Sequence, residues 1–132
     1  MNYWTGKIQD IDVPGPNDRI FTLDIAKSIV DQFKLQQLVG TSMLGTMIND
    51  WNYGQYKSQD VTHKVSDMWI LEGGIWATVL IYPQGKGAML SKVLETPDRA
   101  SFVLVGDGEI LTVKEHKFVQ NYRLQSVVGV LL

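Results

Sequence analysis

The chain has 132 residues, a mass of 14.9 kDa and a formal net charge of −2 at pH 7. That length suits one domain, here residues 1–132, and the near-neutral charge argues against binding to nucleic-acid phosphates. The sequence contains no cysteine, which excludes disulfides, thiolate nucleophiles and thiolate zinc sites. Its longest internal uncharged stretch, residues 73–85, is too short to span a bilayer, so we expect no membrane partner.

A helical apolar pattern begins after Thr22, a residue type that can cap a helix. Ile25, Ile29 and Phe33 recur every four positions, which places them on one face of a helix. The spacing predicts an amphipathic helix over residues 23–36.

Two strands joined by a tight turn are predicted in the middle of the chain. Residues 64–72 and 75–82 are rich in β-branched and aromatic side chains. Gly73-Gly74, between them, can adopt the positive φ angles of a hairpin turn. Trp69 and Trp76 flank this turn, so we expect them to be cross-strand or core partners.

The remaining part of the chain predicts one more helix and several more strands. Apolar spacing predicts a helix over residues 86–96. Short strands are predicted over residues 102–105 and 109–113, with Gly106-Asp107-Gly108 as a hairpin turn, and residues 118–131 predict one or two further strands. The whole pattern predicts an α+β fold: a mostly antiparallel curled sheet or small β-barrel with two packed helices.

Two apolar or aromatic segments are candidates for contact with another protein. The C-terminal run is either a last strand within the sheet or a strand that docks on a neighbouring subunit. The polar loop over residues 49–56 carries three aromatic side chains, which either pack locally or form an interface. The candidate interface residues are Trp51, Tyr53, Tyr56, Val127, Val128, Val130, Leu131 and Leu132.

The sequence predicts neither a metal site nor a cofactor site. The two histidines, His63 and His116, lack further ligands at helical or hairpin spacing, so no metal site is predicted. The short glycine pairs at 85–87 and 106–108 do not follow a phosphate-cradling pattern, so no cofactor is predicted.

An ordered set of segments resembles the prohead core proteases of tailed phages, the capsid-maturation serine proteases related in fold to herpesvirus assemblin. Val61-Thr62-His63-Lys64-Val65, followed by Met68-Trp69-Ile70, closely resembles the family's Val-Ser-His-Lys-Ile and Leu-Trp-Ile segment. The other matching segments are residues 12–21, 44–45, 74–86, 86–95, 101–110 and 122–124. Together they cover roughly residues 6–131, and the resemblance implies an assemblin-like fold.

The resemblance implies a serine protease site, but three of its positions are changed. Asn49 stands where the family has the histidine of its Gly-Glu-Leu-x-His-Pro block, and an amide cannot act as a general base. Val103 and Leu104 stand where the family has two serines before its Arg-Gly-x-Gly turn. An ungapped count would instead place Ser101 there, but it would misplace the glycine pair. His63 matches the family's second histidine.

These departures predict a protein that is not an enzyme. The leading interpretation is a structural virion protein of a tailed phage, most simply a multi-copy decoration or cement subunit bound to the major capsid protein or another virion protein. The alternatives are an active, divergent protease that uses Ser101 and His63, a scaffold-associated partner of a separate protease, or a neck or tail component. A shared fold would also place Asn49, His63 and residues 101–104 close together as a remnant site.

Overall fold

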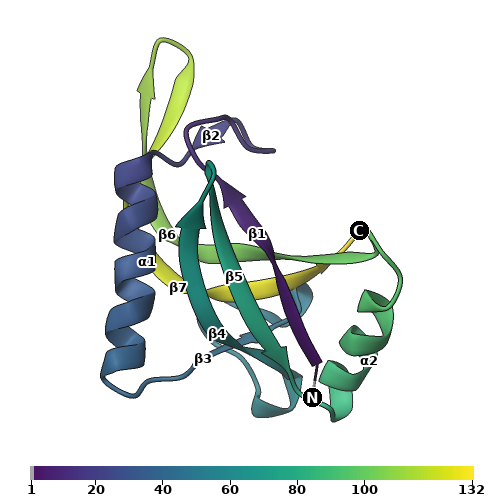
Figure 1. Cartoon of the computed structure of the whole chain (residues 1–132). Coiled ribbons are helices and arrows are strands. Elements are labelled where there is room, and N and C mark those ends of the chain that lie inside the picture. The colour runs from purple at the N-terminus through teal and green to yellow at the C-terminus, as the bar shows by residue number, and fades with distance from the viewer. Residues whose placement is uncertain (1) are drawn as a thin grey trace.

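A computed structural model describes residues 2–132 of the chain. Two helices and seven strands, with two short 3₁₀ helices between β3 and β4, make up this part of the chain (Figure 1). The elements in chain order are β1 (Asn2–Asp10), β2 (Arg19–Ile20), α1 (Leu23–Leu38), β3 (Met43–Thr46), η1 (Ile48–Asp50), η2 (Ser58–Asp60), β4 (Val61–Leu71), β5 (Gly74–Ile81), α2 (Gly85–Leu94), β6 (Ala100–Val113) and β7 (His116–Leu131). None of the helices within residues 2–132 is long and apolar enough to cross a membrane.

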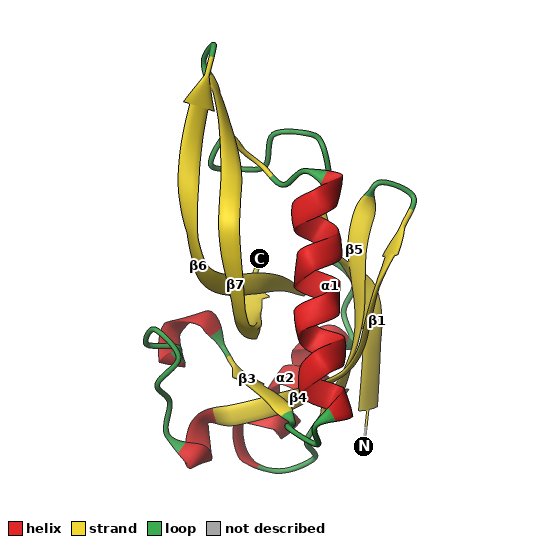
Figure 2. Ribbon diagram, turned by 90° about the vertical axis from the view of Figure 1, so that its left-hand side faces the viewer, coloured by secondary structure: helices red, strands yellow, loops and turns green. Residues whose placement is uncertain are grey.

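The strands form two separate sheets, ordered β1-β5-β4-β3 and β2-β7-β6. All neighbouring strands are antiparallel except β2 and β7, which are parallel. Helix α1 packs against strands of both sheets, β4 and β7, and α2 lies at the opposite end of the molecule (Figures 1 and 2). The predicted α+β class with two packed helices is confirmed.

The strands are mostly antiparallel, as predicted, but the two sheets do not close into a barrel, so the small β-barrel is not the arrangement found. Strands β1 and β6 meet at the place where a barrel would have to close. They contact each other through the rings of Trp4 and Phe102, whose centroids are 4.8 Å apart, and they are not paired with each other.

The core lies between the sheets and the buried face of α1. This helix contributes Ala26, Ile29, Val30 and Phe33; of the three residues in the predicted four-residue spacing, Ile29 and Phe33 are buried and Ile25 is partly buried. Its first turn is capped by Thr22, whose hydroxyl accepts a hydrogen bond from the Ile25 amide at 3.4 Å. The sheets contribute apolar side chains that include Val65, Met68, Ile75, Val79, Phe102 and Val127.

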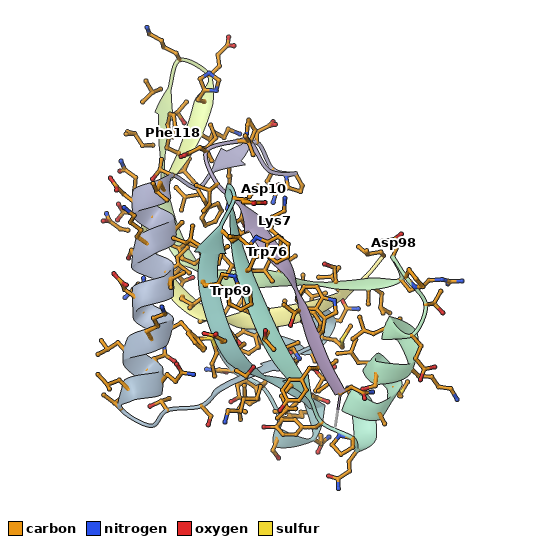
Figure 3. All side chains as sticks on the ribbon, in the orientation of Figure 1. Lys7, Asp10, Trp69, Trp76, Asp98 and Phe118 are labelled. Atoms are coloured by element: carbon orange, nitrogen blue, oxygen red, sulfur yellow. The ribbon has the colours of Figure 1, made fainter. Side chains whose placement is uncertain are left out.

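The β4–β5 hairpin confirms the predicted tryptophan pair. Trp69 and Trp76 are directly opposite in the strand register, and Figure 3 shows them side by side on the two strands. The turn itself lies one residue earlier than predicted, because Leu71 pairs with Gly74 and the two turn residues are Glu72 and Gly73, both at positive φ.

The glycines at 106 and 108 do not form a hairpin turn, so that prediction is wrong. Strand β6 runs without interruption from Ala100 to Val113, with irregular register against β7 at both glycines. A Cβ atom on Gly106 or Gly108 would contact the ring of Tyr122 at 2.8 or 3.1 Å. These glycines therefore permit a close approach between strands, and the hairpin turns instead at Lys114-Glu115.

The C-terminal apolar run is the last part of strand β7. Val127 and Val128 are fully buried within this chain, so their selection as interface candidates is corrected. Burial follows from their pairing with Leu104 and Val103 between layers of the fold. Val130 is half-buried, and Leu131 and Leu132 remain exposed.

Candidate functional site

His63 lies in the interior of the fold with both ring nitrogens engaged. It belongs to β4, and none of its surface is exposed. Its Nε2 atom is 2.6 Å from the carbonyl oxygen of Val127, and its Nδ1 atom is 2.6 Å from the hydroxyl of Thr62. The ring of Phe102 packs edge-on against the imidazole, with centroids 4.8 Å apart.

The partners of the imidazole define its protonation state. A carbonyl oxygen can only accept a hydrogen bond, so Nε2 of His63 carries the hydrogen and donates it to Val127. The unprotonated Nδ1 then accepts a hydrogen bond from Thr62. Burial lowers the pKa of His63 from 6.5 to about 4, and the bond to Val127 only partly opposes this effect. The side chain is therefore neutral near pH 7, and its hydrogen-bonding capacity is used inside the protein.

A surface cleft of about 590 Å³ lies over the part of β6 that matches the family's nucleophile strand. Residues Val103–Asp107 of β6 line it, together with residues of η1 and the loop that follows it. The loop between β1 and β2 and Phe21 also contribute to the lining. The lining residues are Gln9, Gly15, Pro16, Asn17, Arg19, Phe21, Ile48, Trp51, Tyr53, Val103, Leu104, Val105, Gly106, Asp107, Tyr122 and Gln125.

The residue types in the cleft determine what chemistry it can perform. The cleft lining contributed by residues 2–132 contains no serine, threonine, cysteine, histidine or lysine. The polar side chains form a short chain of hydrogen bonds: Trp51 Nε1 donates to Gln125 Oε1 at 3.3 Å, and Gln125 Nε2 donates to Asp107 Oδ2 at 3.0 Å. Burial, with a smaller effect of Asp107, raises the pKa of Tyr122, so its phenol stays protonated.

The structure brings together only some of the predicted site residues. Val103 and Leu104 line the cleft, and Leu104 also packs against the core. Asn49 lies exposed in η1, and neither it nor His63 lines the cleft, although His63 contacts Phe102 of the 101–104 segment, as predicted. Ser101 is half-buried opposite Val130, outside the cleft lining.

The fold is similar to that of a solved protease structure. The bacteriophage T4 capsid assembly protease, gp21, superposes with a TM-score of 0.84 at 17% sequence identity, covering 97% of this chain and 80% of that chain. The chain has a prohead protease-like fold. The resemblance identified from the ordered motifs is thereby confirmed at the level of the fold. Neither a family model nor a curated protein sequence matches the chain.

In this prohead protease-like fold, the loop over residues 49–56 has two of its three aromatic side chains packed together and the third exposed. Trp51 and Tyr56 stack with centroids 5.5 Å apart and an angle of 18° between their planes. Tyr53 sits at the tip of a tight turn and is 88% exposed. Local packing therefore accounts for two of the three aromatic residues, and Tyr53 remains available for contact.

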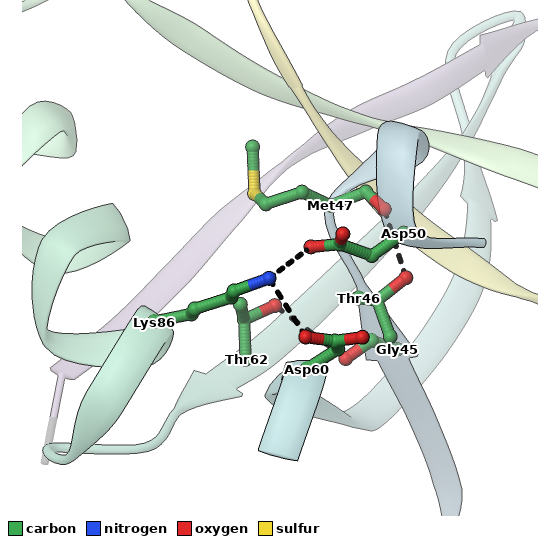
Figure 4. Close-up of polar contacts among 7 residues, drawn as sticks. All are labelled: Gly45, Thr46, Met47, Asp50, Asp60, Thr62 and Lys86. Atoms are coloured by element: carbon green, nitrogen blue, oxygen red, sulfur yellow. Dashed lines mark hydrogen bonds and ion pairs between the residues drawn. The ribbon is translucent and has the colours of Figure 1, made fainter. Parts of the chain in front are cut away.

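A charged cluster that the sequence did not reveal joins α2 to both 3₁₀ helices. Lys86 Nζ donates to Asp60 Oδ1 at 2.7 Å and to Asp50 Oδ2 at 2.9 Å, as Figure 4 shows. These hydrogen bonds raise the pKa of Lys86. The three residues are distant in sequence and match no motif, so only the fold could pair them. No group of three or more His, Asp or Glu side chains within residues 2–132 is arranged to hold a metal ion.

Proposed function

We propose that this protein is a catalytically inactive relative of the prohead proteases that serves as a structural protein of a tailed-phage particle. The observation that carries the proposal is the composition of the cleft. A serine protease needs a nucleophile within hydrogen-bond reach of a general base. Here the lining residues at the expected nucleophile position are Val103 and Leu104, and no histidine lines the cleft that residues 2–132 form.

The surroundings of His63 support the same conclusion. A general base must have a nitrogen free to take a proton from the nucleophile. Both nitrogens of His63 are instead bonded to Thr62 and Val127 in the interior. Protonation of this buried ring is unfavourable, which a pKa of about 4 reflects. These properties fit a histidine that stabilises the fold.

Within residues 2–132, no histidine makes a hydrogen bond to Ser101, the alternative nucleophile, because both ring nitrogens of His63 bond to Thr62 and Val127. Ser101 lies on β6 opposite Val130, two residues before Val103, which lines the cleft. Removing one member of a catalytic triad lowers kcat by about 10⁴-fold or more. A protein without an accessible serine–histidine pair is therefore expected to show no proteolysis.

A serine-reactive fluorophosphonate probe tests the loss of activity. The wild-type protein should remain unlabelled, as should Ser101→Ala, while an active serine protease in the same assay is labelled. Labelling of the wild type that disappears in Ser101→Ala would establish the active, divergent protease and overturn the proposal.

The structural role that we favour is decoration or cement on the capsid, with the major capsid protein as the partner. Tyr53, Val130, Leu131 and Leu132 keep exposed or partly exposed apolar surface that a capsid contact could bury. Quantitative mass spectrometry of purified virions and of immature proheads should find the protein in many copies in the mature particle. Its presence only in proheads would indicate a scaffold-associated partner, and a few copies per virion would indicate a neck or tail component.

A further inference from the structure

The β6–β7 hairpin projects from the body of the molecule as an arm, defined here as residues 107–119. Figures 1 and 2 show it extending past the end of α1 that begins at Leu23. Every residue from Asp107 to Lys117 is exposed. A two-stranded ribbon has two edges, and each edge carries backbone N–H and C=O groups that a further strand can bind.

The β7 edge of this ribbon is protected. Strand β2 pairs with β7 at Lys117 and Phe118. Beyond that point the side-chain amide of Gln32, from α1, donates to the carbonyl of Tyr122 and accepts from the amide of Leu124, both at 2.8 Å. One glutamine thus satisfies the two backbone groups that an additional strand would bind there.

The β6 edge of the arm has no such protection. Within the part of the chain that the structure describes, the backbone of residues 107–113 makes no hydrogen bond to another backbone group except those that pair it with β7. The segment Ile110-Leu111-Thr112-Val113 carries neither a charge nor a proline, two of the features that block an exposed edge, and the register irregularities of β6 lie before it, at residues 105–109. Ile110, Leu111 and Val113 are each at least 40% exposed. The edge is therefore open and apolar.

We propose that two copies of this chain associate through the β6 edges of their arms, pairing antiparallel about a two-fold axis near Leu111. An open strand edge can pair with an extended strand. Here the same edge of a second copy of the chain can supply that strand. Pairing about Leu111 sets Ile110 opposite Thr112 and Glu109 opposite Val113, so no like charges face each other within this segment. Because the β7 edge of the arm is closed, each arm offers one edge, and association through the arms stops at the dimer.

This inference does not depend on the proposed virion role, since it rests only on the arm. The buried surface is confined to one strand and its flanking side chains. We therefore expect a reversible, concentration-dependent dimer rather than an obligate one.

Sedimentation equilibrium measured over a wide concentration range tests the dimer. The wild type should show a monomer–dimer equilibrium, and Leu111→Lys should weaken it about tenfold or more by placing two lysines opposite each other. Leu38→Lys is the matched control, since Leu38 is 83% exposed at the far end of α1. A wild type that stays monomeric throughout, or a dimer that Leu111→Lys leaves unchanged, would overturn the proposal.

Cysteine cross-linking provides an independent readout, because the natural chain contains no cysteine. Leu111→Cys should form a disulfide-linked dimer under mild oxidation, since paired strands bring opposite Cβ atoms within ~5.5 Å. Leu38→Cys should cross-link much more slowly at the same concentration. Equal rates for the two variants would contradict pairing at the arm, even if Leu111→Lys failed to fold.

Discussion

Acidification should destabilise this protein through His63. The folded state holds the neutral imidazole, with a pKa of about 4, whereas the unfolded chain binds a proton near pH 6.5. Between these values the unfolded state holds more protons, so the free energy of unfolding falls as the pH falls. The difference amounts to about 2 kcal/mol at pH 5 and about 3 kcal/mol at pH 4, relative to neutral pH.

Urea unfolding followed by tryptophan fluorescence at pH 7 and pH 5 measures this loss. His63→Gln removes the titration but retains an amide that can donate to the Val127 carbonyl, so its stability should depend less on pH by about 2 kcal/mol. His116→Gln, at an exposed position in the arm, is the matched control and should behave like the wild type. An equal pH dependence in wild type and His63→Gln would refute the reasoning, whatever the absolute stability of the variant.

Three further substitutions test the packing around this histidine and the helix. Gly45→Ala should destabilise the fold by about 1–3 kcal/mol, because a Cβ atom there overlaps with Nε2 of His63 and the carbonyl of Val127; unchanged urea unfolding would contradict this. Phe102→Ala should cost about 3–5 kcal/mol in the same assay, since the ring is buried against His63, and a loss below 1 kcal/mol would show that the site collapses. Thr22→Ala should cost about 1 kcal/mol by removing the α1 cap, and an unaltered midpoint of thermal unfolding would argue against that role.

Local patterns in the sequence were sufficient for most of the elements. The four-residue spacing of Ile25, Ile29 and Phe33 predicted α1, because burial of one helix face is a property of the helix itself. The glycine turn and the two flanking tryptophans predicted the β4–β5 hairpin to within one residue, since both strands are adjacent in the chain.

The same reasoning failed at residues 106–108, where glycine has two possible uses. A glycine pair is equally consistent with a turn and with a close approach between strands. The choice depends on Tyr122, a residue of the opposite strand whose ring fills the space above both glycines. Sequence spacing cannot supply that contact, so the long bulged strand and its projecting arm were missed.

The candidate site likewise combines residues that the sequence identified and contacts that only the fold creates. Asn49, Val103 and Leu104 were singled out through the resemblance of the sequence to the prohead proteases, whose motifs have a histidine and two serines at these positions. The burial of His63, the ion pairs of Lys86 and the capping of the β7 edge by Gln32 each join segments far apart in the chain. Only the tertiary structure could decide these, since a hydrogen bond or a buried charge depends on which segments the fold brings together.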